Sequence, residues 1–234
     1  MVQNSRPELV LVSGYSGVGK SSVVNELHKV LGPPVDLIAS GKFDQSSRDI
    51  PYSTLAHAFQ SLTRGLLAKS DADLATWRDA LREALGPNGR LMTDLVPELA
   101  LIIGEQPPVS DLPAQTAQRR FHLVFRRFIG VFERAHHPLA LFLDDLQWAD
   151  PATLHAIEDL LTRSDVQHLL VIGAYRDHEV DPGHPLLHRI AAIREAGTAV
   201  TDIRLTALTG AHVQQLVADA LRCEPGYTDS LARS

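Results

Sequence analysis

The chain alternates short apolar runs, typical of buried strands, with longer stretches in which apolar residues recur every three or four positions, typical of helices. The apolar runs predict strands near residues 8–12, 35–39, 139–143, 169–174 and 201–205. Because helical patterns separate most of these runs, we expect an α/β fold with a mostly parallel central sheet.

The region between the second and third predicted strands has helical patterns, and we expect a helical insertion at about residues 53–135. Ser53 is a candidate N-cap of its first helix. Residues 91–113 contain several prolines, which predicts a loop with one short helix around residues 92–96.

The last helix of this insertion is predicted over residues 114–135. Phenylalanines lie along one of its sides: Phe121, Phe125, Phe128 and Phe132. Arginines fall largely off that side: Arg119, Arg120, Arg126, Arg127 and Arg134. We interpret these arginines as a solvated basic face, with a phosphate-sensing arginine as the alternative.

The first candidate for chemistry is the glycine-rich segment GYSGVGKSS, residues 14–22, between the first strand and the first helix. Gly14, Gly19, Lys20 and Ser21 fit G-x-x-x-x-G-K-[ST], the pattern of a phosphate-binding loop. Glycines let backbone N–H groups point at phosphates, and the helix N-terminus adds partial positive charge. We expect Lys20 to reach the β- and γ-phosphates of a nucleoside triphosphate and the Ser21 hydroxyl to ligate Mg²⁺.

The second candidate is a pair of acids at the end of the third predicted strand. Asp144 and Asp145 directly follow the apolar run, so their carboxylates should lie at the carboxyl edge of the sheet. Asp144 suits a role in holding Mg²⁺, usually through its water shell. Asp145 could orient or deprotonate the attacking water. Asp150, which directly precedes a proline, is predicted to cap the next helix.

Two further segments should reach the same edge of the sheet. The polar residues 40–45 follow the second predicted strand, and we expect them to form a ligand-contacting loop. Arg176 follows the fourth predicted strand and could reach the γ-phosphate, reporting whether that phosphate is present.

Amino-acid composition and net charge restrict the classes of function that we consider. The 234 residues are 44% hydrophobic and 21% charged, as in an ordinary globular protein. The net charge of −6 gives no electrostatic reason to propose nucleic acid as a partner. Cys223 is the only cysteine, and no apolar stretch is long enough for a membrane span, so we expect a cytoplasmic location.

Several segments in order resemble a known family: GYSGVGKSS, SGKFDQ, LALFLDDLQWAD and GAYRDHEV, followed by His184-Pro185-Leu186. They resemble the origin-recognition-like AAA ATPase module of the STAND signalling NTPases. More narrowly, the chain is similar to the module between the Ser/Thr-kinase and sensor histidine-kinase parts of multidomain bacterial signalling proteins. The resemblance covers nearly the whole chain. It implies a P-loop NTPase three-layer sandwich that acts as a nucleotide-operated switch and assembly platform.

The resemblance also implies roles for individual residues. Triphosphate contacts would come from Gly17, Val18, Gly19, Lys20, Ser21 and Ser22, with Gly14 and Ser16 completing the predicted loop. Mg²⁺ would be held by Ser21 and Asp144. Asp145 would activate water, and Arg176 would sense the γ-phosphate. The implied cofactors are therefore ATP and Mg²⁺, and the implied partners are kinase domains of a signalling pathway and further copies of the chain in a nucleotide-dependent homo-oligomer.

Members of this group also carry a glycine-arginine box near the adenine, a helical lid and a winged-helix segment. We expect residues 1–234 to form one NTPase domain without that box, with the start of the lid at about residues 223–234. Three functions stay open: slow ATP hydrolysis, ATP binding without meaningful turnover, and phosphorylation of a small molecule. A GTPase is disfavoured because the sequence has no Asn-Lys-x-Asp stretch.

Overall fold

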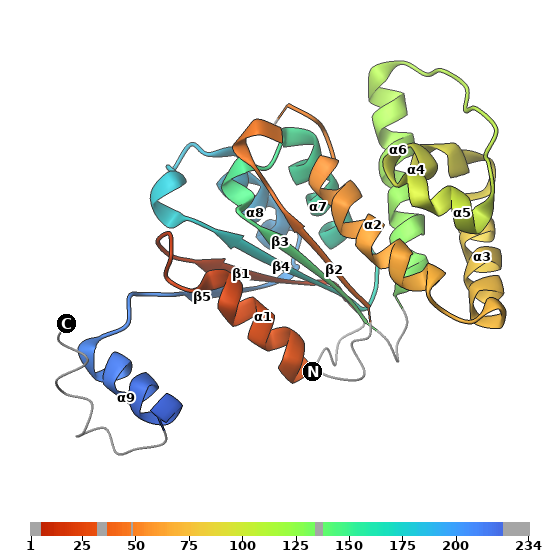
Figure 1. Ribbon diagram of the computed structural model, residues 1–234. Helices are drawn as coiled ribbons and strands as arrows, with labels where there is room; N and C mark the ends of the chain where they lie inside the picture. The colour runs from red at the N-terminus through yellow and green to blue at the C-terminus, as the bar shows by residue number, and fades with distance from the viewer. Residues whose placement is uncertain (1–5, 32–36, 48, 134–137, 222–234) are drawn as a thin grey trace.

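The computed structural model describes residues 6–31, 37–47, 49–133 and 138–221. Its strands form one parallel sheet in the order β2-β3-β4-β1-β5 (Figure 1). The strands are β1 (Glu8–Ser13), β2 (Leu37–Lys42), β3 (Leu139–Asp144), β4 (Leu169–Tyr175) and β5 (Ala199–Arg204). The predicted α/β class with a parallel sheet is confirmed. Because β4 lies between β1 and β3, the carboxyl ends of these three strands meet at one edge.

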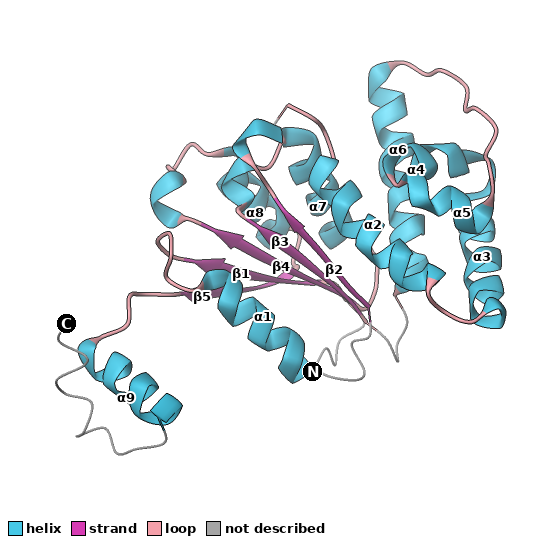
Figure 2. Ribbon diagram, viewed as in Figure 1, coloured by secondary structure: helices cyan, strands magenta, loops and turns pink. Residues whose placement is uncertain are grey.

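Helices cover both faces of the sheet and extend beyond it (Figure 2). The described helices are α1 (Lys20–Leu31), α2 (Ser53–Leu67), α3 (Asp71–Leu85), α4 (Gly89–Leu95), α5 (Ala100–Ile103), α6 (Ala114–Phe132), α7 (Pro151–Thr162), α8 (Pro185–Glu195) and α9 (Gly210–Leu221). No helix in the described ranges is both long and apolar enough to cross a bilayer.

Two hydrophobic clusters lie on opposite faces of the sheet, because successive side chains of a strand point to opposite sides. Leu9 and Leu11 of β1 pack in the larger cluster with residues of α7 and α8. Val12 packs in the smaller cluster with Val24 of α1. The sheet is thus held between α1 on one face and α7 and α8 on the other, the three layers that the family resemblance implied.

The segment between β2 and β3 forms a helical group, α2 to α6, on the β2 side of the sheet (Figure 1). Its centre is aromatic: the Phe59 ring of α2 meets Phe125 and Phe128 of α6 edge to face, with ring centroids 5.7 and 5.3 Å apart. Phe125, Phe128 and Phe132 are buried, and these residues belong to the same large cluster as the sheet. The helical group is therefore continuous with the main core.

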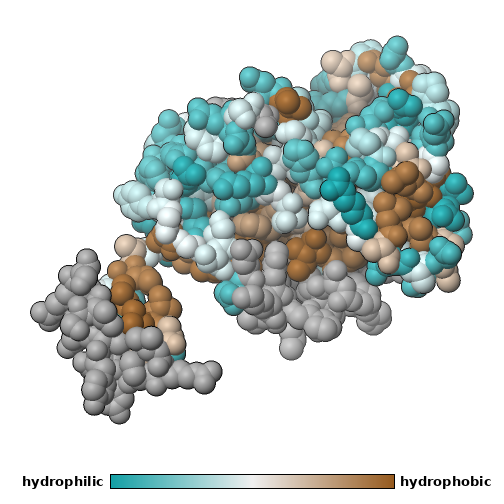
Figure 3. Space-filling model, in the orientation of Figure 1, coloured by the Kyte–Doolittle hydropathy of each residue, from teal (hydrophilic) through white to brown (hydrophobic). Residues whose placement is uncertain are grey.

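The C-terminal helix α9 stands apart from the sheet beyond β5 (Figure 1). Its visible surface is largely hydrophobic in Figure 3, and the Leu216 side chain is 60% exposed. Residues 222–234, where the start of a lid was expected, lie outside the described residues.

The second strand differs from its prediction at its carboxyl end. Residues 35 and 36 lie outside the described residues, and β2 continues through polar residues to Lys42. Ser40 pairs with Phe142 and Lys42 with Asp144 of β3, whose backbone satisfies the hydrogen bonds of this polar stretch. Residues 40–42 are thus part of the sheet and only the residues after them form the expected loop.

Helix ends in and after the insertion agree with the sequence predictions in part. Tyr52, with left-handed backbone (φ 62°), is the N-cap of α2, while Ser53 is the first helical residue. The proline-rich stretch is more helical than predicted, since α4 begins at Gly89 and α5 follows it. The prediction for Asp150 is confirmed, because its carboxylate accepts a hydrogen bond from the Thr153 N–H at 2.8 Å.

The prediction of a solvated basic face on α6 is wrong for Arg126 and only partly right for Arg120, which is partly buried and donates to the Ser110 carbonyl at 2.8 Å. The Arg126 side chain is only 13% exposed and forms ion pairs with Asp159 of α7 and, at 3.1 Å, with Asp165. Packing of α6 against α7 explains this burial. Arg119 and Arg127 are exposed, and Arg134 lies outside the described residues.

Candidate functional site

The loop between β1 and α1 requires glycine at its first position. Gly14, Gly17 and Gly19 have positive φ angles of 148°, 77° and 99°. A Cβ atom on Gly14 would lie 2.6 Å from the Leu205 carbonyl oxygen at the end of β5. The Leu205 N–H in turn donates to the Ser13 carbonyl at 2.8 Å. The close approach of β5 therefore excludes a side chain at position 14.

We expect Gly14→Ala to lower the free energy of unfolding by about 1–3 kcal/mol, because the loop and the end of β5 must separate. Urea unfolding followed by circular dichroism measures this change. Gly65→Ala is the control, since Gly65 lies within α2 with open space around it, and the added methyl should stabilise the helix by about 0.5–1 kcal/mol. A Gly14→Ala protein as stable as the parent would contradict the steric argument.

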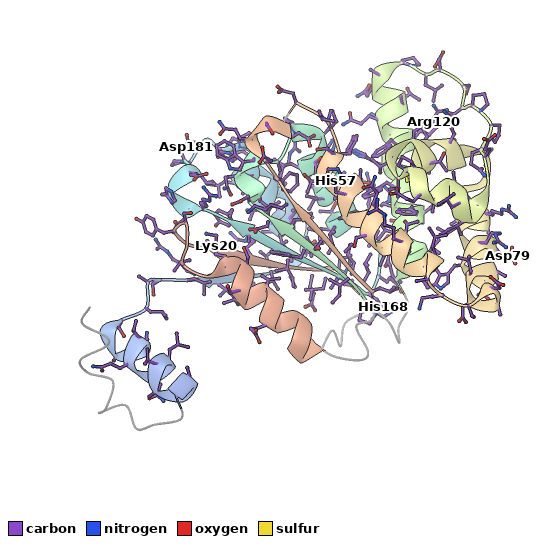
Figure 4. The ribbon with its side chains drawn as sticks, viewed as in Figure 1. Lys20, His57, Asp79, Arg120, His168 and Asp181 are labelled. Atoms are coloured by element: carbon purple, nitrogen blue, oxygen red, sulfur yellow. The ribbon has the colours of Figure 1, made fainter. Side chains whose placement is uncertain are left out.

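Lys20 is held by the loop that precedes it. Its Nζ donates to the carbonyl oxygens of Gly14 and Tyr15, both at 2.8 Å, and the residue is 7% exposed. Burial, and secondarily the charge of Arg176, lowers the pKa of the Lys20 ammonium below its ordinary value. Figure 4 shows Lys20 at the start of α1, beside the carboxyl edge of the sheet. The ammonium group is thus fixed next to the loop.

The loop and the acidic pair, far apart in the sequence, meet directly. The Ser21 hydroxyl donates to Asp144 Oδ2 at 2.8 Å across 123 positions of the chain. The other oxygen, Oδ1, accepts the Asp145 N–H at 2.9 Å, and Asp144 is 7% exposed. Both predicted Mg²⁺-holding residues are therefore in contact.

This oxygen pair fits the chemistry of magnesium. Mg²⁺ binds oxygen ligands at about 2.0–2.1 Å in an octahedron, which separates adjacent ligands by about 2.8–3.0 Å. The Ser21 and Asp144 oxygens lie 2.8 Å apart, at the short end of that range. A hydroxyl with one or two carboxylates and substrate phosphates is also the usual Mg²⁺ donor set in phosphate-transferring sites.

Asp145 has an uncommon backbone conformation and is surrounded by hydrogen-bond donors. Its backbone is left-handed (φ 56°, ψ 44°), which is uncommon outside glycine and often marks functional positions. Oδ1 faces Gln147 Nε2 at 3.0 Å and Arg176 Nε at 3.2 Å, and Oδ2 faces Lys42 Nζ at 3.5 Å. A carboxylate has about four acceptor positions, so these three partners leave one for a water molecule.

Arg176 follows β4 and lies next to the acidic pair, because β4 adjoins β3. Its Nη1 donates to Glu179 Oε1 at 2.8 Å, and its backbone N–H donates to Gln147 Oε1 at 3.2 Å. The hydrogen bond to Glu179 is the main cause that raises the pKa of the guanidinium above its ordinary value. Arg176 is thus a permanent cation beside Asp145.

A pocket at the carboxyl edge of the sheet is lined by most of the predicted site residues. Its lining consists of Ser16, Gly17, Gly19, Lys20, Ser21, Ser22, Lys42, Asp144, Asp145 and Arg176. Gly14 and Val18 belong to the loop but do not line the pocket; the Val18 N–H donates to the Tyr15 carbonyl at 3.4 Å. Backbone amides and three cationic side chains at one opening can bind a polyanion such as a triphosphate.

Three site residues were not predicted: Lys42, Gln147 and Glu179. Lys42 lay within the polar stretch after the second strand, where ligand contacts were expected without a specific residue. Gln147 follows Asp145 by two positions and Glu179 follows Arg176 by three. All three also lie within the segments SGKFDQ, LALFLDDLQWAD and GAYRDHEV that carry the family resemblance, but neither signal distinguished these side chains from their neighbours.

Comparison with known proteins gives the following matches. Residues 1–172 match the AAA ATPase domain family. The hybrid signal transduction histidine kinase G of Dictyostelium discoideum is 39% identical over 160 residues, which are 68% of this chain and 5% of that protein. Histidine protein kinase 1 of Candida albicans is 25% identical over 170 residues, covering 66% of this chain and 7% of that protein. The matched region is a small part of each relative.

Among solved structures, Cdc6p from Pyrobaculum aerophilum is similar with a TM-score of 0.46 and 12% sequence identity, covering 94% of this chain and 44% of that one. The family match covers both the glycine-rich loop and the strand that ends in the acidic pair. On that match, the chain belongs to the AAA ATPase domain family.

Proposed function

We propose that this chain is a Mg²⁺-ATP-binding module that hydrolyses ATP slowly and acts as a nucleotide-dependent switch in a signalling protein. The observation that carries the proposal is the 2.8 Å contact between Ser21 and Asp144, with the Lys20 ammonium fixed in the adjoining loop. It brings a hydroxyl, a carboxylate and a cation from two distant segments to one point at the carboxyl edge of the sheet.

The residues of the site have distinct roles in this proposal. Loop amides and Lys20 bind the β- and γ-phosphates, and Ser21 and Asp144 hold Mg²⁺. When bound, Mg²⁺ neutralises charge on the phosphate oxygens. Asp145 uses its remaining acceptor position to orient the attacking water and take its proton. Arg176 contacts the γ-phosphate, so the site distinguishes ATP from ADP.

A signalling role is supported by the names of two relatives, both histidine kinases. From the sequence resemblance, we also propose a STAND-type switch, kinase partners and nucleotide-dependent self-association. Nucleic acid is not among the proposed partners, since the net charge of −6 does not favour a polyanion of that size.

A second candidate is ATP binding without meaningful turnover. The engagement of Asp145 by Lys42, Arg176 and Gln147 favours it, because these partners occupy most of the acceptor positions that an attacking water would need. A small-molecule kinase is the third possibility and differs in its product, since the phosphate would appear on an acceptor instead of in water.

A single-turnover experiment tests the proposal. Protein in excess over γ-labelled ATP, with Mg²⁺, should release labelled inorganic phosphate slowly and in full. Removing Mg²⁺ with a chelator should abolish release. Binding without phosphate release would support the second candidate, label on another molecule would support a kinase, and the absence of ATP binding would refute all three.

A further inference from the structure

A buried amide joins the two groups proposed to act on the terminal phosphate. Gln147 is 2% exposed, in the turn that follows Asp145. Its Nε2 donates to Asp145 Oδ1 at 3.0 Å and to Glu179 Oε2 at 3.2 Å. Its Oε1 accepts the Arg176 N–H at 3.2 Å. With both amide hydrogens and the carbonyl engaged, this side chain has one orientation, and it fixes the spacing of its partners.

Glu179 completes the arrangement around Arg176. Its Oε1 accepts from Arg176 Nη1 at 2.8 Å, while its Oε2 accepts from Gln147. Arg176 Nε faces Asp145 at 3.2 Å. Two carboxylates therefore hold the guanidinium, Asp145 at Nε and Glu179 at Nη1.

We infer that Gln147 and Glu179 are positioning residues that orient the Arg176 guanidinium toward the terminal phosphate of a bound nucleoside triphosphate. This inference rests on the proposed function. An arginine already held in its binding orientation loses less side-chain entropy when the phosphate arrives. Arg176 also lines the pocket with Lys20, and burial together with the Arg176 charge lowers the pKa of the Lys20 ammonium. The two cations therefore face the same part of the pocket. Since a diphosphate lacks the terminal phosphate, this orientation of Arg176 should increase the affinity for the triphosphate alone.

The test compares the affinities for ADP and for a non-hydrolysable ATP analogue, both with Mg²⁺, by calorimetry. In Glu179→Gln the preference for the triphosphate should fall by about three- to tenfold, with ADP affinity unchanged. Gln147→Met, which keeps the side-chain volume but removes the amide, should act in the same direction. Circular dichroism and thermal unfolding check that both variants are folded.

Glu158→Gln is the matched control. Glu158 Oε2 accepts from Arg189 Nη1 at 2.7 Å, and its side chain is 21% exposed, against 23% for Glu179. The control should leave the triphosphate preference unchanged. Added to Arg176→Ala, Glu179→Gln should cause no further loss, because Glu179 acts through the arginine.

The outcomes separate the inference from the function on which it rests. An unchanged preference in folded Glu179→Gln and Gln147→Met proteins would overturn the inference and leave the proposed function standing. A raised preference would also overturn it, since Glu179 would then compete with the phosphate for Arg176. A parent protein that binds neither nucleotide would overturn both.

Discussion

Calorimetric titration of a Lys20→Ala variant with Mg²⁺-ATP is expected to show a loss of affinity of about a hundredfold or more, to below detection. Lys20 is the cation that the loop itself fixes, through hydrogen bonds from Nζ to two of the loop's carbonyl oxygens. In the proposed complex this ammonium group exchanges those carbonyls for phosphate oxygens, which accept stronger charge-assisted hydrogen bonds. Alanine can make neither interaction.

Controls must show that the lost affinity comes from the missing Lys20 contact, and not from the lower positive charge of the protein or from unfolding. Lys69→Ala removes the same charge at an exposed position after α2 and should bind ATP as the parent does. Lys20→Met keeps most of the buried volume, so it should also fail to bind while unfolding at a temperature close to that of the parent. Unchanged ATP affinity in a folded Lys20→Ala protein would refute the assignment of the phosphate-binding loop.

Asp145→Asn is expected to keep ATP binding but to slow single-turnover phosphate release by about a hundredfold. The amide has the same shape but is not a base, so it cannot take a proton from water. The substitution suits the backbone, because asparagine adopts the left-handed conformation of this residue readily. The ATP binding constant and the rate of phosphate release are the two measurements.

A carboxylate on a sheet residue away from the pocket provides the comparison for Asp145. Asp202 of β5 pairs with Arg194 away from the pocket, so Asp202→Asn should release phosphate at the parental rate. Equal phosphate release from Asp145→Asn and the parent would exclude Asp145 as the base and favour a role limited to holding Arg176 and Lys42.

Much of the fold was predictable because strands and helices have local periodicities. The apolar runs that became β1, β3 and β4 are bounded by turns and have no competing pattern, and they were placed to within one or two residues of their structural ends. The second strand was harder, because Ser40, Gly41 and Lys42 have no apolar side chains and become a strand only by pairing with β3. Arg126 shows the same limit, since only its neighbours on α7 and beyond explain its burial.

The candidate site was likewise predictable from the sequence only in part. The glycine-rich loop and the acidic pair were visible because each is a contiguous motif whose chemistry depends on its own residues. Of the partners of Asp145, Arg176 was predicted, whereas Lys42 and Gln147 were not, because contact with Asp145 depends on how the neighbouring strand and the following turn fold. Lys42 reaches Asp145 from β2, beside β3, and Glu179 reaches Gln147 from the turn after β4.

By itself, the sequence determined the class of the fold, the loop, the acids and the arginine at a strand end, since each of these depends on spacing within a few residues. Only the tertiary structure decided that Ser21 touches Asp144, and that Lys42, Gln147 and Glu179 surround the groups expected to act on the phosphate. The physical reason is that strand order and register set these contacts, and both depend on how distant segments pack together.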